Sequence, residues 1–142
     1  MNVDLTQFHE IEFPSHCDIV YVLEYIKSGD TSAIPFYVGE TSRHMGRFGD
    51  YVSAKFSAST DFKVGEAVRY LRACGYKVMI KYKESNSRRA DEESILKTLV
   101  QEGHRLLNSL AGYDYRNSDE ERERLRIRGF IDELIRITDS AE

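Results

Sequence analysis

A glutamate in line with an apolar helical stripe is the residue of this sequence best placed to do chemistry. The spacing over residues 88–101 predicts a helix, whose apolar stripe consists of Ile95, Leu96, Leu99 and Val100. At about 100° per residue, Glu92 points within about 10° of that stripe, whereas Glu93 points about 90° away and is the alternate. A carboxylate on the buried side of a helix is costly unless it is paired or binds a metal. The alternative is a first-turn glutamate that stays solvated and is stabilised by the helix dipole.

Two tyrosines and two arginines earlier in the chain are further candidates. Tyr21 and Tyr37 each lie within a β-branched and aromatic run, where a tyrosine taken singly is a packing residue. Gly39 follows closely and would let a second backbone, such as that of a nucleic acid, approach. Arg43 and Arg47 come next, four positions apart. That spacing places both guanidinium groups on one helical face, which suits a phosphate and equally suits plain solvent exposure.

Three strands and four helices must position these residues. Period-two and aromatic patterns predict strands at 17–26, 34–40 and 76–83. Helical spacing predicts helices at 42–56, 61–74, 88–101 and about 118–139. The third strand alternates and should be half-buried, with Val78, Ile80 and Tyr82 on its inner face. We expect an α/β (α+β) fold in one domain, 1–142, with its core at about 17–112. Its small three-stranded antiparallel sheet is flanked by helices, and an extra C-terminal helix follows.

The charge of the chain is unevenly distributed. The 142 residues carry a formal net charge of −4, yet residues 63–89 hold eight Lys and Arg against two Glu, a local net charge of +6. The candidates for contacts with a nucleic-acid backbone are Lys77, Lys81, Lys83, Arg88 and Arg89. Such contacts position a duplex without reading its sequence. A set of solvated surface charges explains the same pattern equally well.

Cysteine usage and hydropathy bear on the compartment. Cys17 and Cys74 do not form a ligand-spaced pair, so we expect two reduced thiols in a cytoplasmic protein. No apolar run approaches the length of a membrane span, and residues 1–12 lack the basic start and apolar stretch of a signal peptide. We therefore expect no membrane partner, and either a monomer or a homodimer.

The strand motifs, the arginine and the glutamate together resemble the GIY-YIG nuclease family. Residues 19–21, IVY, resemble the first motif that names the family, and residues 37–39, YVG, resemble the second. Arg47 stands at the place of the family's essential arginine, Glu92 at that of its metal-binding glutamate, and Asn108 at that of its usual asparagine. The resemblance runs from residue 19 to residue 108.

The sequence departs from the family pattern at several positions. The first motif lacks its glycine. Tyr51 stands one turn after Arg47, where the family often has a histidine, and His44 is nearby but out of register. Arg43 is a rival to Arg47 for the arginine role, and His44 is a further alternate.

The resemblance implies a reaction and a role for each residue. One divalent ion, Mg²⁺ or Mn²⁺, would be held by Glu92, since Mg²⁺ keeps much of its hydration when a single carboxylate binds it. Tyr21, supported by Tyr37, would orient or deprotonate the attacking water. A phenol of pKa near 10 needs a lowered pKa to act as a base at neutral pH. Arg47 would bind the scissile phosphate, and Asn108 would position the glutamate or a phosphate oxygen.

Three functions are therefore open from the sequence. The first is a metal-dependent endonuclease that hydrolyses nucleic-acid phosphodiester bonds, with DNA favoured over RNA. The second is the same fold kept as a nucleic-acid-binding or protein-interaction module with weak or lost catalysis. The third is an unrelated α/β interaction domain in which each motif match is a coincidence.

Overall fold

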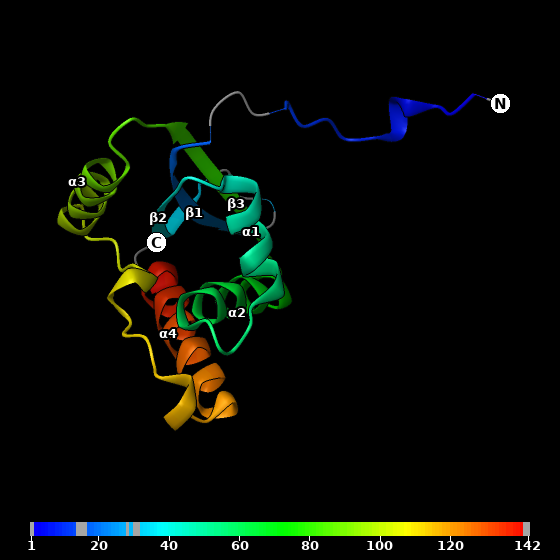
Figure 1. Ribbon diagram of the computed structural model, residues 1–142. Coiled ribbons are helices and arrows are strands. Elements are labelled where there is room, and N and C mark those ends of the chain that lie inside the picture. Colours follow the sequence, from blue (N-terminus) through cyan, green and yellow to red (C-terminus); the bar gives the residue numbers. More distant parts are fainter. Residues whose placement is uncertain (1, 14–16, 28, 30–31, 141–142) are drawn as a thin grey trace.

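Three antiparallel strands form the centre of the molecule. The structure is a computed structural model that describes residues 2–13, 17–27, 29 and 32–140 (Figure 1). The strands are β1 (Ile19–Lys27), β2 (Ile34–Thr41) and β3 (Tyr76–Glu84), in the spatial order β2-β1-β3. Both neighbours of β1 run antiparallel to it, and Tyr21 lies opposite Gly39 of β2 and Tyr82 of β3. The expected mixed fold with a three-stranded antiparallel sheet is confirmed.

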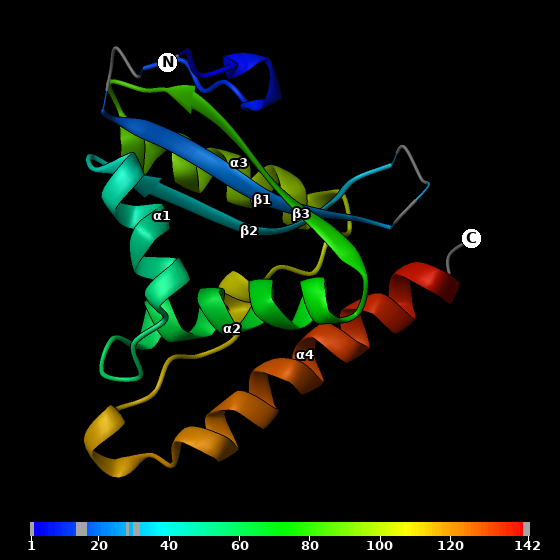
Figure 2. The same ribbon diagram turned by 90° about the vertical axis from the view of Figure 1, so that its right-hand side faces the viewer.

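Helices cover both faces of this sheet. One face receives α1 (His44–Ser53) and α2 (Ser59–Ala73), with α4 (Glu120–Ser140) packed against α2. The other face receives α3 (Arg88–Gln101), which contacts β2 and β1. Figure 2 shows α3 behind the sheet, α1 in front of it, and α2 and α4 below.

The two faces of β1 differ in chemistry because side chains alternate along a strand. The buried residues that β1 directs toward α1 and α2 are Ile19, Tyr21, Leu23 and Tyr25. We call this side the tyrosine face. Val20 and Val22 point the other way, against Ile95 of α3, and we call that side the α3 face. The main core lies on the tyrosine face, because no residue of α3 is fully buried.

A close crossing of α1 and α2 sets the height of α1 above the sheet. A Cβ atom at Gly65 of α2 would collide with the carbonyl oxygen of Tyr51 and with the side chain of Ala54. Ala54 ends α1 in the left-handed conformation, with φ of 47°. The absence of a side chain at Gly65 thus lets α1 lie close enough to place Tyr51 over the tyrosine face.

The third strand is less buried than its pattern predicts. Val78 is half-buried, but Ile80 is 42% exposed and Tyr82 is 61% exposed. The outer strand β2 is covered by α3 and by the 3₁₀ turn at Leu107–Ser109, whereas the main helix contact of β3 is with α2 alone. Val100 of the predicted α3 stripe is also exposed, at 56%.

The segment before the sheet, residues 2–13, packs against nothing that the structure describes. All of its residues are exposed, including a short 3₁₀ turn at Leu5–Gln7, and it extends away from the domain (Figure 1). We call it the arm. Within the described residues, no helix combines the length and apolar character that crossing a bilayer requires.

Candidate active site

Three phenols and a guanidinium meet on the tyrosine face. The hydroxyl groups of Tyr21 and Tyr51 share a short hydrogen bond. Arg47 Nε donates to the Tyr51 hydroxyl oxygen at 3.1 Å, and its guanidinium carbon lies 4.6 Å from the centre of the Tyr51 ring. The Tyr37 ring centre is 6.4 Å from that of Tyr21 and 6.3 Å from that of Tyr51. The predicted convergence of Tyr21, Tyr37 and Arg47 is therefore present in the structure, with Tyr51 at its centre.

Tyr51 is the residue that the sequence interpretation did not assign. Its position four residues after Arg47 was a usable signal, because residues at that spacing share a helical face. Only the tertiary structure shows that its hydroxyl group bridges Arg47 to Tyr21.

Gly39 has a packing role in the sheet. A Cβ atom at this position would collide with the ring and hydroxyl group of Tyr21, which lies opposite it in the sheet. Packing against Tyr21 thus explains this glycine, and the expected contact with a nucleic-acid backbone stays a prediction. This glycine makes room for the Tyr21 phenol to lie across β2.

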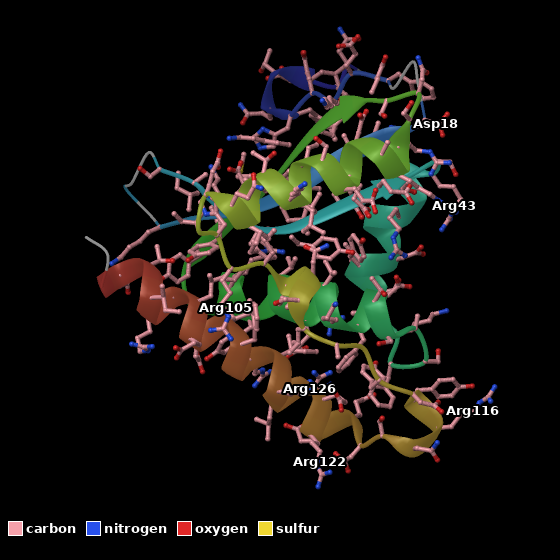
Figure 3. All side chains as sticks on the ribbon, turned by 90° about the vertical axis from the view of Figure 1, so that its left-hand side faces the viewer. Asp18, Arg43, Arg105, Arg116, Arg122 and Arg126 are labelled. Atoms are coloured by element: carbon pink, nitrogen blue, oxygen red, sulfur yellow. The ribbon has the colours of Figure 1, made fainter. Side chains whose placement is uncertain are left out.

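The structure separates the two arginines. Arg47 is largely covered, with 22% of its side chain exposed, and its Nη1 donates to Asp61 at 2.5 Å. The Arg43 side chain is 63% exposed and pairs with Asp50 at 3.0 Å. Figure 3 shows Arg43 reaching outward from the start of α1. Arg47 is the arginine that reaches the phenols.

His44 does not join the site. It is buried, and its ring centre lies 6.5 Å from that of Tyr82 on β3. This contact joins His44 to β3, whereas Tyr37 belongs to β2, the strand at the other edge of the sheet.

Burial keeps the phenols protonated. It raises the pKa of Tyr21 to about 12, and Arg47 and the Tyr51 hydrogen bond offset only part of this rise. Burial likewise raises the pKa of Tyr37 and of Tyr51. The lowered pKa that a tyrosine general base requires is thus not found for Tyr21 in the free protein, and its role in orienting or deprotonating the water stays a prediction. Burial also opposes the charged form of Arg47, but electrostatic interaction with Tyr51 and Asp61 outweighs it and raises the pKa of the guanidinium.

Glu92 lies on the α3 face, at the edge formed by β2. Burial raises its pKa, and the negative charges of Glu40 and Glu93 raise it further. Burial and Tyr51 raise the pKa of Tyr37, and the negative charge of Glu92 adds a smaller rise. Glu92 itself belongs to the α3 face, and the hydrogen-bonded phenols belong to the tyrosine face. Glu93 is exposed, so Glu92 is the inward member of the pair.

Asn108 binds the strand β2. Its side chain, in the 3₁₀ turn Leu107–Ser109, accepts a hydrogen bond from Val38 N at 2.9 Å and donates one to Val38 O at 2.8 Å. Both ends of the amide contact the strand, and the expected contact with Glu92 or a phosphate oxygen stays a prediction. Asn108 holds the free edge of β2 and thereby the neighbouring residues Tyr37 and Gly39.

The predicted nucleic-acid contacts are only partly compatible with this geometry. Arg88 pairs with Asp18 at 3.0 Å and with Glu40 at 2.5 Å, so its charge is already neutralised. Lys81 pairs with Glu24 at 2.8 Å. Lys77, Lys81 and Lys83 all lie on β3, the edge of the sheet opposite to Tyr37. The three lysines are exposed, and so is Arg89 at the start of α3.

The carboxylates of this edge fit a hydrated divalent ion better than a dehydrated one. Among the described residues, no group of three or more His, Cys, Asp and Glu could surround a metal. Glu40 raises the pKa of Glu92 even though Arg88 pairs with Glu40, and a cation at Glu92 would relieve that repulsion. Mg²⁺ is commonly bound through one or two carboxylates with several retained waters. The donor set is therefore compatible with hydrated Mg²⁺ or Mn²⁺.

Comparison with known proteins adds no relative. No protein-family model, no curated protein and no solved structure matches this chain.

Proposed function

We propose that this chain is a metal-dependent endonuclease of the GIY-YIG type, which hydrolyses nucleic-acid phosphodiester bonds, with DNA favoured over RNA. The observation that supports this function best is the hydrogen-bonded series of Tyr21, Tyr51 and Arg47 on the tyrosine face. Phosphodiester hydrolysis needs a positioned water, a cation for the phosphate and help for the departing oxygen. These residues supply groups suited to each need.

Arg47 is the phosphate-binding group of the proposal. Its Nε is engaged with Tyr51 and its Nη1 with Asp61, which fixes the plane of the guanidinium. The guanidinium has five N–H donors, so it can still donate to a phosphate oxygen beside these two contacts. Because Arg47 is already held in place, little reorganisation is needed as negative charge develops on the phosphate.

The phenols orient the water and do not remove its proton in the free protein, because their pKa values lie far above neutral. The water oxygen bonds to phosphorus, the phosphorus–oxygen ester bond breaks, and a water proton ends on the departing oxygen. Glu92 would hold the divalent ion, which would supply charge stabilisation to the phosphate and the leaving group. Exposed Arg43 and Arg89 are the cations that we expect to contact neighbouring phosphates.

A catalytically inactive binding module of the same fold is the second candidate. The observation that favours it is the raised pKa of all three phenols, since it leaves the free protein without a tyrosine base.

A plasmid-nicking assay with and without Mg²⁺ or Mn²⁺ separates the two candidates. We expect metal-dependent nicking by the natural protein and a loss of about 1,000-fold in Glu92→Gln, because the metal-binding carboxylate supplies several kcal/mol of stabilisation. The matched control is Glu93→Gln, whose exposed side chain lies one position away and whose activity should stay within about threefold. The same assay on a labelled RNA hairpin tests the preference for DNA.

Two results contradict the proposal. Nicking at the natural rate by Glu92→Gln removes the glutamate from the mechanism. Retarded migration of DNA in a gel without nicking under any metal identifies the binding module. Thermal unfolding of each variant shows whether the fold is intact.

A further inference from the structure

The outer edge of β3 is open to another strand. β3 pairs with β1 on one side, and no strand that the structure describes pairs with the other side. Three apolar or aromatic side chains of β3 are exposed: Met79 is 43% exposed, Ile80 is 42% exposed and Tyr82 is 61% exposed. An unprotected edge with exposed apolar residues is a template for strand addition.

An apolar groove lies beside this edge on the tyrosine face, between β3, α1 and α2. Its volume is about 490 Å³. Its apolar walls include Leu23, Phe48, Val52, Val68, Val78 and Ile80. Arg69, Arg72 and Lys77 form a basic rim. A strand added here should therefore direct apolar side chains into the groove and carry negative charge that complements the basic residues of this edge.

The arm has both properties. Ile11 is 85% exposed and Phe13 is 90% exposed, and they alternate with Glu10 and Glu12. Residues 2–13 contain three acidic residues and no Lys or Arg. Alternation of apolar and charged side chains is the pattern of a strand with one buried face. The arm has this pattern but, in the single chain, nothing on which to bury it.

The same alternation with opposite charge occurs on β3. There the exposed apolar residues Ile80 and Tyr82 alternate with Lys81 and Lys83, which point to the α3 face. Two strands paired side by side place residues of one face next to each other. Apolar residues of the arm would then cover the groove, while its glutamates would lie beside the lysines of β3.

We propose that the arm of a second copy of this chain adds as a strand to the outer edge of β3. Ile11 and Phe13 cover the apolar groove, and Glu10 and Glu12 pair with the lysines on the opposite face of the added strand. The exchange is reciprocal, as expected for a symmetric dimer, so each copy gives one arm and receives one. This inference does not depend on the proposed nuclease function.

The connection to β1 favours a second copy over the chain's own arm. Asp18 O accepts a hydrogen bond from Ser85 N at 3.0 Å, so the chain enters β1 at the end of β3. Phe13 precedes Asp18 by only five positions. To reach the outer edge of its own β3, the arm would have to cross the end of that strand and reverse direction within this stretch. An arm from a second copy has no such constraint.

The mass of the full-length protein in solution, measured by sedimentation equilibrium, tests the proposal with two charge-reversed variants. One variant is Glu10→Lys with Glu12→Lys in the arm, and the other is Lys77→Glu with Lys83→Glu on β3. Lys81 is kept in both because it pairs with Glu24. We expect the natural chain, of 16.4 kDa, to form a dimer of twice that mass. We expect each variant alone to dimerise at least tenfold more weakly, because its arm and its β3 edge then carry like charges.

Mixing the two variants in equal amounts is the decisive step. Only exchange between copies pairs the basic arm of one variant with the acidic β3 of the other, so the mixture should regain the natural dimer. The control variant is Leu125→Lys on α4, which should leave the dimer unchanged. Leu125 is an apolar residue that is 58% exposed, close to the 61% of Tyr82 on β3. Circular dichroism checks that each variant is folded.

Three results would overturn the proposal. The first is a natural protein that stays a monomer at every concentration; protection of its arm amides from hydrogen exchange would then assign the arm to its own chain. The second is variants that dimerise as well as the natural chain, and the third is a mixture of folded variants that fails to dimerise.

Discussion

Glu66 on α2 and Glu92 on α3 are both glutamates drawn into contacts between elements, and their surroundings are opposite. Glu66 is only 2% exposed, and three arginines surround it. Arg128 approaches its carboxylate to 2.9 Å, Arg124 to 3.5 Å and Arg69 to 3.9 Å. Glu92 is half-buried, and no cation among the described residues forms an ion pair with it.

The difference separates a structural charge from one available to a ligand. Two of the arginines around Glu66 come from α4, so its saturated carboxylate joins α4 to α2. Glu92 instead lies near other carboxylates, and this arrangement raises its pKa. Partial burial of a carboxylate near other carboxylates costs free energy unless a cation binds it. The comparison therefore favours Glu92, and not the more deeply buried Glu66, as the metal-binding residue of the proposed function.

The largest effect that we expect is on folding. Glu66→Ala should lower the free energy of unfolding by about 3 kcal/mol, because it leaves Arg128 and Arg124 without their partner at the α2–α4 contact. Glu92→Ala should change the free energy of unfolding by less than about 0.5 kcal/mol, since it removes no ion pair. Urea denaturation followed by circular dichroism measures both. Equal losses in the two variants would remove the distinction between the two glutamates.

The second effect concerns the arginines. Arg47→Ala should lower the nicking rate about 100-fold, because a donor aimed at the developing phosphate charge is lost. Arg43→Ala should lower it by only about threefold, since its exposed side chain makes a rim contact at most. Steady-state nicking rates at saturating DNA measure the difference. The reverse order would transfer the phosphate-binding role to Arg43.

The smallest effect is a dependence of stability on pH. The folded-state pKa of Glu92 lies above its ordinary value of 4.5, so the folded protein binds this proton more tightly than the unfolded chain. The natural protein should match or exceed the stability of Glu92→Gln below about pH 4.5. It should lose that advantage as the pH rises through the raised pKa. Solvent screening of this half-buried group keeps the difference below about 1 kcal/mol at pH 7.

Urea denaturation of both proteins between pH 4 and pH 8 measures this difference. A stability difference that does not change with pH contradicts the raised pKa of Glu92 in the folded protein. The same comparison of Glu66→Gln with the natural protein provides the contrast with a carboxylate that is fully paired.

Much of the fold could be predicted because its signals are local. The alternation in β3 and the helical spacing in α3 depend on neighbours within a few residues. Both elements begin at the residue predicted, Tyr76 for β3 and Arg88 for α3. The inward direction of Glu92 relative to Glu93 followed from the same helical geometry. Tyr21, Tyr37 and Arg47 were found through motif resemblance, and the structure brings them together.

The roles of other residues depended on contacts that no local pattern encodes. Asn108 lies 70 positions after Val38, and its two hydrogen bonds to that residue could not be read from spacing. The neutralisation of Arg88 likewise required Glu40 of β2 to lie beside the start of α3. The pKa of Tyr21 rises because Gly39, Tyr37 and Tyr51 enclose it, and this enclosure is a product of strand register and helix packing.

The sequence alone determined which elements form and which side chains share a face of each, because backbone periodicity orients side chains wherever a strand or helix lies. Only the tertiary structure decided that β1 is the central strand, so that Tyr37 and the β3 lysines stand on opposite edges. Strand order depends on pairing between distant segments, which is selected by the burial of whole faces and not by the preferences of single residues. That choice placed the candidate site at the β2 edge and left the β3 edge open.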